Sequence, residues 1–267
     1  MNWLLYFDGL TAMLILAFAT WLLSLYLRDV SIVDSAWSLM FLAAALIYFS
    51  AAAPGARSIV LLCLVVIWAL RLSIYLTWRN WGEPEDRRYQ AIREKYSPHF
   101  NIKSLGIIFI FQALLAWVIS LPLFAAFFNA NDFTVIDMVA MPLWVAGIMF
   151  ESIADWQLAR FKSNPANKGK VLDTGLWRYT RHPNYFGECL VWWGFYLFAF
   201  GSGAWWTIFA PLLMTWLLLK VSGMVMLEES IVNRRPRYRE YIRRTNAFIP
   251  GPVKTSGQDG ADEARAS

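Results

Sequence analysis

The stretch LDTGLWRYTRHPNYFGECLVWWGFYLFAF, residues 172–200, joins a dense polar motif to a strongly apolar segment. Within eleven residues, its first part holds Arg178, Arg181, His182, Asn184 and Glu188. Such groups are unfavourable at the mouth of a membrane-spanning segment unless they serve a purpose. We therefore expect a helix to enter a membrane here, and we expect the polar residues before it to have a function.

The composition of the whole chain indicates an integral membrane protein. Of its 267 residues, 58% are hydrophobic and 16% are charged, and the mean hydropathy is +0.42. A soluble domain of this length needs more charge to cover its surface. The two histidines, His99 and His182, are too few for a histidine-rich metal site, and Cys63 and Cys189 lie in apolar runs. We expect no metal site and no nucleic-acid partner.

Apolar runs of about 20 residues, each long enough to cross a bilayer, predict an all-α protein with seven membrane-spanning helices. The predicted spans are residues 3–27, 32–53, 58–78, 105–128, 135–161, 184–200 and 204–226. Pro122 predicts a kink in the fourth span. A short amphipathic helix is expected within 227–250. We expect residues 1–250 to form one domain and the polar tail 251–267 to be disordered.

Basic residues predict how the spans are oriented. Lys and Arg concentrate in residues 79–103, 162–181 and 234–244, whereas the connections 129–134 and 201–203 carry none and 54–57 carries one. The positive-inside rule then places the N-terminus outside and the C-terminus in the cytoplasm of a multi-pass protein in the cell inner membrane. The basic segments have two interpretations: they converge on an anionic cofactor, or they only set topology and contact anionic lipids.

Several polar residues lie within or at the edge of predicted spans. They are Asp34, Arg71, Glu151, Asp155, Asn184 and Glu188. Glu151 and Asp155 are four residues apart, as are Asn184 and Glu188, so each pair shares one helix face. Ionisable groups in hydrocarbon need partners or a polar cavity. An interhelical salt-bridge network, for example Arg71 with Asp34 or Glu151, is the structural alternative.

Two polar clusters flank the last spans. His182 with Arg178 and Arg181 precedes a helix N-terminus, a place that attracts phosphate, although no GxGxxG or Walker loop is present. The alternative is an interfacial histidine before Pro183 at the first helical turn. The second cluster is Glu228-Glu229 with Tyr238 and Tyr241. Its alternative is an interfacial amphipathic helix.

The quoted motif resembles a known family. The segment GLWRYTRHPNYFGE (175–188), followed by EES (228–230) and RYREYIRRTNAFIP (237–250), is similar to the C-terminal region of the membrane steroid 5-alpha-reductase superfamily. The segment LRLSIYLTWRNWGEPEDRRYQAIREKY (70–96) is similar to bacterial proteins of unknown function grouped with those reductases. The resemblance covers roughly residues 28–250.

Two classes share the pattern RHPxY followed by a glycine. The reductases reduce an activated carbon–carbon double bond with NADPH, whereas the isoprenylcysteine and phospholipid methyltransferases use S-adenosylmethionine. In the reductases an Asn and an acid of Asn-Tyr-x-Gly-Glu/Asp contact the cofactor, which matches Asn184 and Glu188. The methyltransferases commonly carry Glu-Glu after the last span. This chain has Glu228-Glu229, where steroid 5-alpha-reductases carry histidines.

The resemblance also implies roles outside the motif. Asp155 matches an aspartate in the helix before it, and Arg71 fits an arginine before the first large cytoplasmic loop. Asp34 is a weaker match to a glutamate that binds the substrate carbonyl. The tyrosine that partners this glutamate falls near Trp68, so its phenol is missing there, and Tyr75 is a candidate replacement.

The leading hypothesis is an NADPH-dependent reductase of an enone in a hydrophobic, steroid-like or lipid substrate that enters from the bilayer. A protonated Asp34 would donate to the substrate carbonyl, since burial raises the pKa of a carboxylic acid. Asp34, Tyr75 and Trp68 are the expected catalytic positions. The expected cofactor-binding residues are Arg71, Glu151, Asp155, Arg178, Tyr179, Arg181, His182, Asn184, Tyr185, Glu188, Glu228 and Tyr241.

Two other functions stay open. In a membrane methyltransferase, His182, Tyr185 and Glu228 would line the S-adenosylmethionine site, because a cationic sulfonium favours acidic and aromatic surroundings. In a non-enzymatic lipid-binding or scaffold protein, the polar residues would serve as packing contacts between helices.

Overall fold

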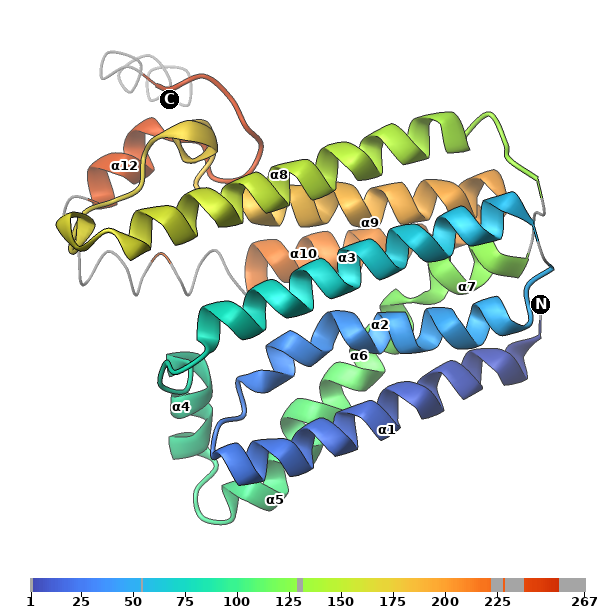
Figure 1. Cartoon of the computed structure of the whole chain (residues 1–267), viewed down its shortest axis with the longest axis horizontal. Helices are drawn as coiled ribbons and strands as arrows, with labels where there is room; N and C mark the ends of the chain where they lie inside the picture. The colour runs from blue at the N-terminus through green and yellow to red at the C-terminus, as the bar shows by residue number, and fades with distance from the viewer. Residues whose placement is uncertain (1, 54, 129–131, 222–227, 229–237, 255–267) are drawn as a thin grey trace, which may run out of the picture. The chain divides into compact units, whose positions relative to one another are not determined.

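The computed structural model of the chain describes residues 2–53, 55–128, 132–221, 228 and 238–254. Every regular element within these ranges is helical and none is a strand, which confirms the predicted all-α class (Figure 1). The chain divides into two compact units. The first unit comprises residues 1–138 and 195–210, and the second comprises residues 139–194 and 211–267.

The first unit is built on three long helices that lie side by side (Figure 1). These are α1 (Trp3–Leu27), α2 (Ile32–Ser50) and α3 (Ala56–Asn80). The chain continues through α4 (Arg87–Lys95), α5 (Phe100–Ser104), the π-helical η1 (Leu105–Ile110), α6 (Phe111–Ile119) and α7 (Leu121–Phe128). The short η4 (Trp205–Ile208) also belongs to this unit. Its core contains the fully buried side chains of Met13, Phe41, Tyr48, Trp68 and Phe124.

The predicted kink at Pro122 is present as a break between α6 and α7. α6 ends at Ile119 and α7 begins at Leu121, because a proline inside a helix removes one backbone donor. The carbonyl of Trp117, in the last turn of α6, accepts hydrogen bonds from the hydroxyl groups of Tyr6 and Ser120, both at 2.7 Å. Side-chain hydroxyls thus bond to a backbone group at the break, as helices in membranes require.

The second unit contains most of α8 (Asp137–Ser163) and the first part of α9 (Pro183–Gly201). Between them lie the 3-10 turns η2 (Pro165–Asn167) and η3 (Gly175–Arg178). Beyond α9 follow α10 (Phe209–Trp216), the π-helical η5 (Leu217–Val221) and α12 (Tyr238–Arg244). α12 confirms the predicted short helix within 227–250. Of the tail that we expect to be disordered, residues 255–267 lie outside the described residues.

Five helical segments are long and apolar enough to cross a membrane. They are α1, α2, α3, the continuous run Phe100–Ile119 and α8. These segments expose large apolar side chains, including Leu4, Ile74 and Met138, as expected where lipid is the solvent. The chain is therefore a multi-pass membrane protein. α9 has 19 residues but is not among these five segments, and the predicted seventh span continues past residue 221, outside the described residues.

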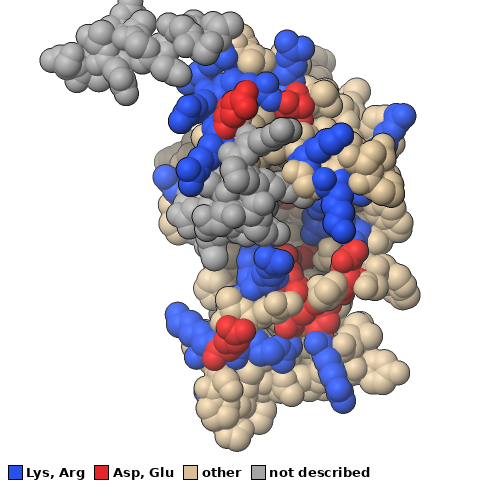
Figure 2. Space-filling model, turned by 90° about the vertical axis from the view of Figure 1, so that its left-hand side faces the viewer, with Lys and Arg blue, Asp and Glu red and all other residues tan. Residues whose placement is uncertain are grey.

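Charged side chains gather at one end of the first unit. Figure 2 views this end, where α1 and α3 finish and α4 lies, and both Lys/Arg and Asp/Glu side chains cover it. The opposite sign of neighbouring charges here indicates ion pairs rather than a purely basic, topology-setting surface.

Candidate functional site

Glycines let α8 and α9 pack with their backbones in contact. A Cβ atom added at Gly187 would lie 2.5 Å from the backbone nitrogen of Glu151 and 2.6 Å from the carbonyl oxygen of Gly147. One added at Gly147 would lie 2.7 Å from the carbonyl oxygen of Gly187. Small residues at helix crossings are typical of membrane proteins. Figure 1 shows α8 and α9 lying along each other, and the close approach at Gly147 and Gly187 sets which faces of the two helices meet.

The crossing brings the two predicted polar pairs together in an acid–amide cluster, which we define as Glu151, Asp155, Asn184 and Glu188. The three carboxyl-bearing residues are 3%, 4% and 7% exposed. Asn184 Nδ2 donates to Asp155 Oδ1 at 3.3 Å, and Trp192 Nε1 donates to Glu188 Oε1 at 3.0 Å. Buried carboxyl groups of this kind can accept hydrogen bonds from hydroxyl or amide groups of a ligand.

The loop before α9 is anchored to the second half of α8. Trp177 Nε1 donates to the carbonyl of Ala154 at 3.1 Å, and Leu176 N donates to Gln157 Oε1 at 3.0 Å. Two predicted cofactor-binding residues in this loop, Arg178 and Tyr179, have exposed side chains. As part of this anchored loop, they remain accessible to a ligand in solution.

The structure places Arg181 in contacts within the protein. Its Nε and Nη2 donate to the two carboxyl oxygens of Glu228 at 2.7 and 3.2 Å, and Nη1 donates to the carbonyls of Ile242 and Thr245, both at 2.9 Å. Every nitrogen of the guanidinium group therefore donates to another part of the chain. This geometry does not suit the phosphate-binding role expected for Arg181.

Glu228 also contacts the histidine of the motif. His182 Nε2 lies 2.9 Å from Glu228 Oε1, and the His182 ring stacks on Tyr185 with a centroid distance of 5.5 Å. Burial raises the pKa of Glu228, but the hydrogen bonds from His182 and Arg181 outweigh it, so the net pKa lies below the ordinary value. Glu228 is thus an ionised partner of the motif, while Glu229 lies outside the described residues.

Tyr241 likewise holds the loop. Its side chain is buried, and its hydroxyl donates to the carbonyl of Trp177. Burial raises the pKa of this phenol, and neighbouring Tyr238 adds to the effect, so the hydroxyl keeps its proton. The described contacts of Tyr241 are with the chain rather than with an open site.

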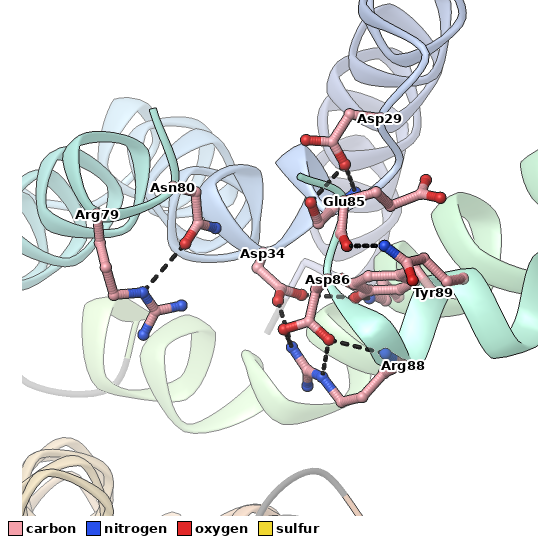
Figure 3. Close-up of polar contacts among 11 residues, drawn as sticks. Asp29, Asp34, Arg79, Asn80, Glu85, Asp86, Arg88 and Tyr89 are labelled. Carbon is pink, nitrogen blue, oxygen red and sulfur yellow. Dashed lines mark hydrogen bonds and ion pairs between the residues drawn. The ribbon is translucent and has the colours of Figure 1, made fainter. Parts of the chain in front are cut away.

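In the first unit, Asp34 is the centre of a second cluster (Figure 3). Arg88 Nη2 donates to Asp34 Oδ2 at 2.8 Å, and the Tyr89 hydroxyl donates to Asp34 Oδ1 at 2.6 Å. Arg88 Nε also donates to Asp86 Oδ1 at 3.0 Å, and Gln112 Nε2 donates to the Tyr89 oxygen at 3.2 Å. Both oxygens of Asp34 are acceptors, an arrangement that does not fit the proton donor expected from the sequence.

Tyr89 is the residue that sequence reasoning missed. The expected tyrosine position, Trp68, is fully buried and packs edge-on against Phe41. The alternative, Tyr75, lies 5.6 Å from the guanidinium of Arg71, measured to the ring centroid. The sequence Asp86-Arg-Arg-Tyr89 could have indicated this tyrosine. It lies in a polar segment whose charges we interpreted only as setting the topology or binding an anion.

The pairing of Asp34 with Tyr89 depends on how α4 begins. Asp86 Oδ1 accepts the backbone N–H of Arg88 at 2.9 Å and so caps α4. The preceding Glu85 accepts from Val30 N at 2.9 Å and from Arg93, which ties this segment to the α1–α2 connection. Burial, reinforced by the charge of Asp34, raises the pKa of the Tyr89 phenol.

Comparison with known proteins identifies the family of the chain. A protein-family model described as "protein of unknown function (DUF1295)" matches residues 20–245. The chain belongs to this family. DUF1295 lies within the steroid-reductase-like superfamily. The matched range contains the acid–amide cluster, Glu228, and the Asp34–Tyr89 pair.

The chain is also similar to a curated protein of a yeast. The chain is 30% identical, over 279 residues, to the uncharacterized protein C594.04c of Schizosaccharomyces pombe. The alignment covers 91% of this chain and 78% of the yeast protein. No solved structure matches the chain. The family model and the yeast relative support the family assignment.

Proposed function

We propose that this member of DUF1295 is an NADPH-dependent reductase of an activated carbon–carbon double bond in a hydrophobic substrate of the membrane. One observation carries the proposal: the contact between Asn184 and Asp155. The resemblance to the steroid 5-alpha-reductases implies a cofactor role for each of these residues separately. In the folded chain they meet across the α8–α9 crossing, with Glu188 one turn further along α9.

The chemistry of the acid–amide cluster fits NADPH. The carboxyl groups of Asp155 and Glu188 can accept hydrogen bonds from ribose hydroxyls or the carboxamide, and the Asn184 amide can both donate and accept. Arg178, exposed in the loop before α9, can pair with a phosphate. When bound, NADPH supplies the hydride for the β-carbon. The residues of the chain would bind and orient the cofactor.

The substrate carbonyl needs a hydrogen-bond donor, and we assign this role to Tyr89, whose single phenol proton would pass from Asp34 to the carbonyl oxygen as acceptor when substrate binds. Asp34 holds the phenol through a 2.6 Å hydrogen bond, and Gln112 donates to the phenol oxygen. The raised pKa keeps the Tyr89 proton in place. Polarising a carbonyl makes the conjugated β-carbon electrophilic, which a phenol achieves by donating to the carbonyl oxygen.

Tyr89→Phe should lower kcat for enone reduction by about 100-fold or more, because removing one hydrogen-bond donor to a developing oxyanion costs about 10²–10³-fold. The Kd for NADPH should stay unchanged. Oxidation of NADPH with a set of membrane-soluble enones measures the rate. Tyr96→Phe, just after α4 and exposed, is the matched control. Equal rates for the two variants would remove Tyr89 from the proposed mechanism.

The cofactor assignment is tested by measuring NADPH and S-adenosylmethionine binding side by side on the purified protein. NADPH alone should stabilise the wild type against heating. Glu188→Gln should weaken NADPH binding about tenfold or more, since hydrogen bonds to charged groups contribute about 1.5–3 kcal/mol. Glu94→Gln, an exposed carboxylate on α4, is the control and should bind normally. Stabilisation by S-adenosylmethionine alone would overturn the proposal.

An S-adenosylmethionine-dependent methyltransferase is the second candidate, and the three buried carboxyl groups of the acid–amide cluster favour it, since they suit a cationic sulfonium. The contacts of Glu228 count against it. In this hypothesis Glu228 would contact the cofactor, but its two oxygens accept from Arg181 and lie beside His182. The same contacts also remove Glu228 from the expected NADPH site, so the ranking rests on Asn184 and Asp155, which match two cofactor residues of the reductases and contact each other. We rank the reductase first on this ground.

The proposal includes the predicted arrangement in the membrane: seven spans, the N-terminus outside, the C-terminus in the cytoplasm, and the cell inner membrane as the location. The substrate would be a hydrophobic small molecule that enters from the bilayer. The support is the basic composition of residues 79–103 and 234–244, which the positive-inside rule assigns to the cytoplasmic side.

A further inference from the structure

The chain after Glu228 returns to the loop before α9. We define the C-terminal segment as residues 238–254 and the motif loop as residues 173–182. Arg181 N donates to the carbonyl of Asn246 at 2.9 Å, and Gly251 N donates to the carbonyl of Tyr179 at 3.1 Å. Thr180 Oγ1 donates to the carbonyl of Phe248 at 2.7 Å. Backbone hydrogen bonds thus join the two segments on both sides of Thr180.

Side chains add to this connection. Arg244 pairs with Asp173, and Phe186 in the first turn of α9 packs edge-on against Phe248 at 5.7 Å between ring centroids. α12 has only seven residues, and an isolated helix of this length is unstable in water. The C-terminal segment therefore depends on the motif loop for its structure.

Arg181 connects several parts of this assembly. Its Nη1 donates to the carbonyls of Ile242 and Thr245, which belong to the last turn and the C-terminal end of α12. A cation at the C-terminal end of a helix satisfies free carbonyls and interacts favourably with the helix dipole. The same guanidinium holds both oxygens of Glu228, whose side chain is 17% exposed.

We propose that Arg181, His182 and Glu228 form a latch that holds the C-terminal segment against the motif loop, and that Arg181 and Glu228 are positioning residues rather than ligand contacts. The latch acts on the acid–amide cluster through the start of α9. His182 contacts Glu228 and stacks on Tyr185, the residue that follows Asn184. Release of Glu228 would therefore remove one contact, through His182, that holds the start of α9.

The latch consists of contacts within the second unit and does not depend on the reductase proposal. Its effect on NADPH affinity rests on that proposal. Two measurements test the latch and the cofactor site separately. Hydrogen–deuterium exchange on the full-length protein in detergent reports the latch, and NADPH binding reports the cofactor site.

Glu228→Gln removes the charge and keeps the shape of the side chain. We expect the amides of Arg181 and Gly251 to exchange about tenfold faster than in the wild type, because local opening becomes easier. Glu240→Gln, on an exposed position of α12, is the matched control and should leave both amides protected. If Glu228→Gln does not fold, Arg181→Lys, which keeps the charge and loses the two-pronged contact, should give the same faster exchange.

Unchanged protection of both amides in Glu228→Gln and Arg181→Lys would overturn the latch. If both amides stay protected in these variants but NADPH binding is lost, Arg181 and Glu228 contact the ligand directly. This result also contradicts the proposal. Faster exchange supports the latch even where the wild type does not bind NADPH, in which case only the reductase proposal fails.

Discussion

Asp137→Asn should lower the unfolding temperature of the protein by about 10 °C. Arg57 and Asp137 form an ion pair in which each side chain is 1% exposed, with Arg57 Nε 2.8 Å from Asp137 Oδ2. Arg57 also donates to the carbonyls of Ala126 at 2.8 Å and Phe198 at 2.6 Å. Removing one partner of a buried pair costs about 3–5 kcal/mol, because the other charge stays buried without compensation. Each kcal/mol shifts the midpoint by about 2–4 °C at this size.

Thermal unfolding in detergent, followed by tryptophan fluorescence, measures this effect. Asp132→Asn is the matched control, since Asp132 is exposed five residues earlier and its substitution should change little. The double variant Arg57→Met with Asp137→Leu should recover most of the lost stability, because well-packed apolar residues often replace a buried ion pair without loss. A midpoint for Asp137→Asn equal to that of Asp132→Asn would show that this pair does not hold the first unit together.

The same pair shows what the sequence could and could not predict about the fold. The length of the first apolar run determined the bounds of α1, and the predicted span 3–27 is the helix observed. Arg57 was interpreted only as the single basic residue of the connection 54–57. Its partner is 80 residues away, so no local pattern reveals the pair. Helix positions follow from local apolar runs, whereas buried ion pairs depend on which helix ends meet.

In the candidate site, too, features within one helix could be predicted and contacts between elements could not. Four-residue spacing correctly placed Glu151 with Asp155 and Asn184 with Glu188 on shared helix faces, because that spacing is a property of one helix. The hydrogen bond of Asn184 to Asp155 depends instead on the α8–α9 crossing. Tyr89 was missed because the position of α4 depends on the cap at Asp86 and on a hydrogen bond from the distant α1–α2 connection to Glu85.

Gly187→Ala should therefore damage both stability and the candidate site. The new Cβ would lie 2.5 Å from Glu151 N and 2.6 Å from the carbonyl oxygen of Gly147, and both are backbone atoms of α8. Backbone atoms cannot rotate away as a flexible side chain can, so the helices must separate. Overpacking of this kind costs about 1–3 kcal/mol. Separation also lengthens the 3.3 Å contact of Asn184 with Asp155, so NADPH affinity should fall with the unfolding temperature.

Gly106→Ala is the matched control for this prediction. A Cβ at Gly106 meets no atom within 4 Å, and alanine favours helical structure over glycine by about 1 kcal/mol. This variant should unfold at the wild-type temperature or slightly above it, with unchanged NADPH affinity. A Gly187→Ala variant as stable as Gly106→Ala would mean that α8 and α9 do not touch through their backbones. If Gly187→Ala loses stability but keeps its NADPH affinity, α8 and α9 do pack through their backbones. The contact between Asn184 and Asp155 would then be structural and would not contribute to cofactor binding.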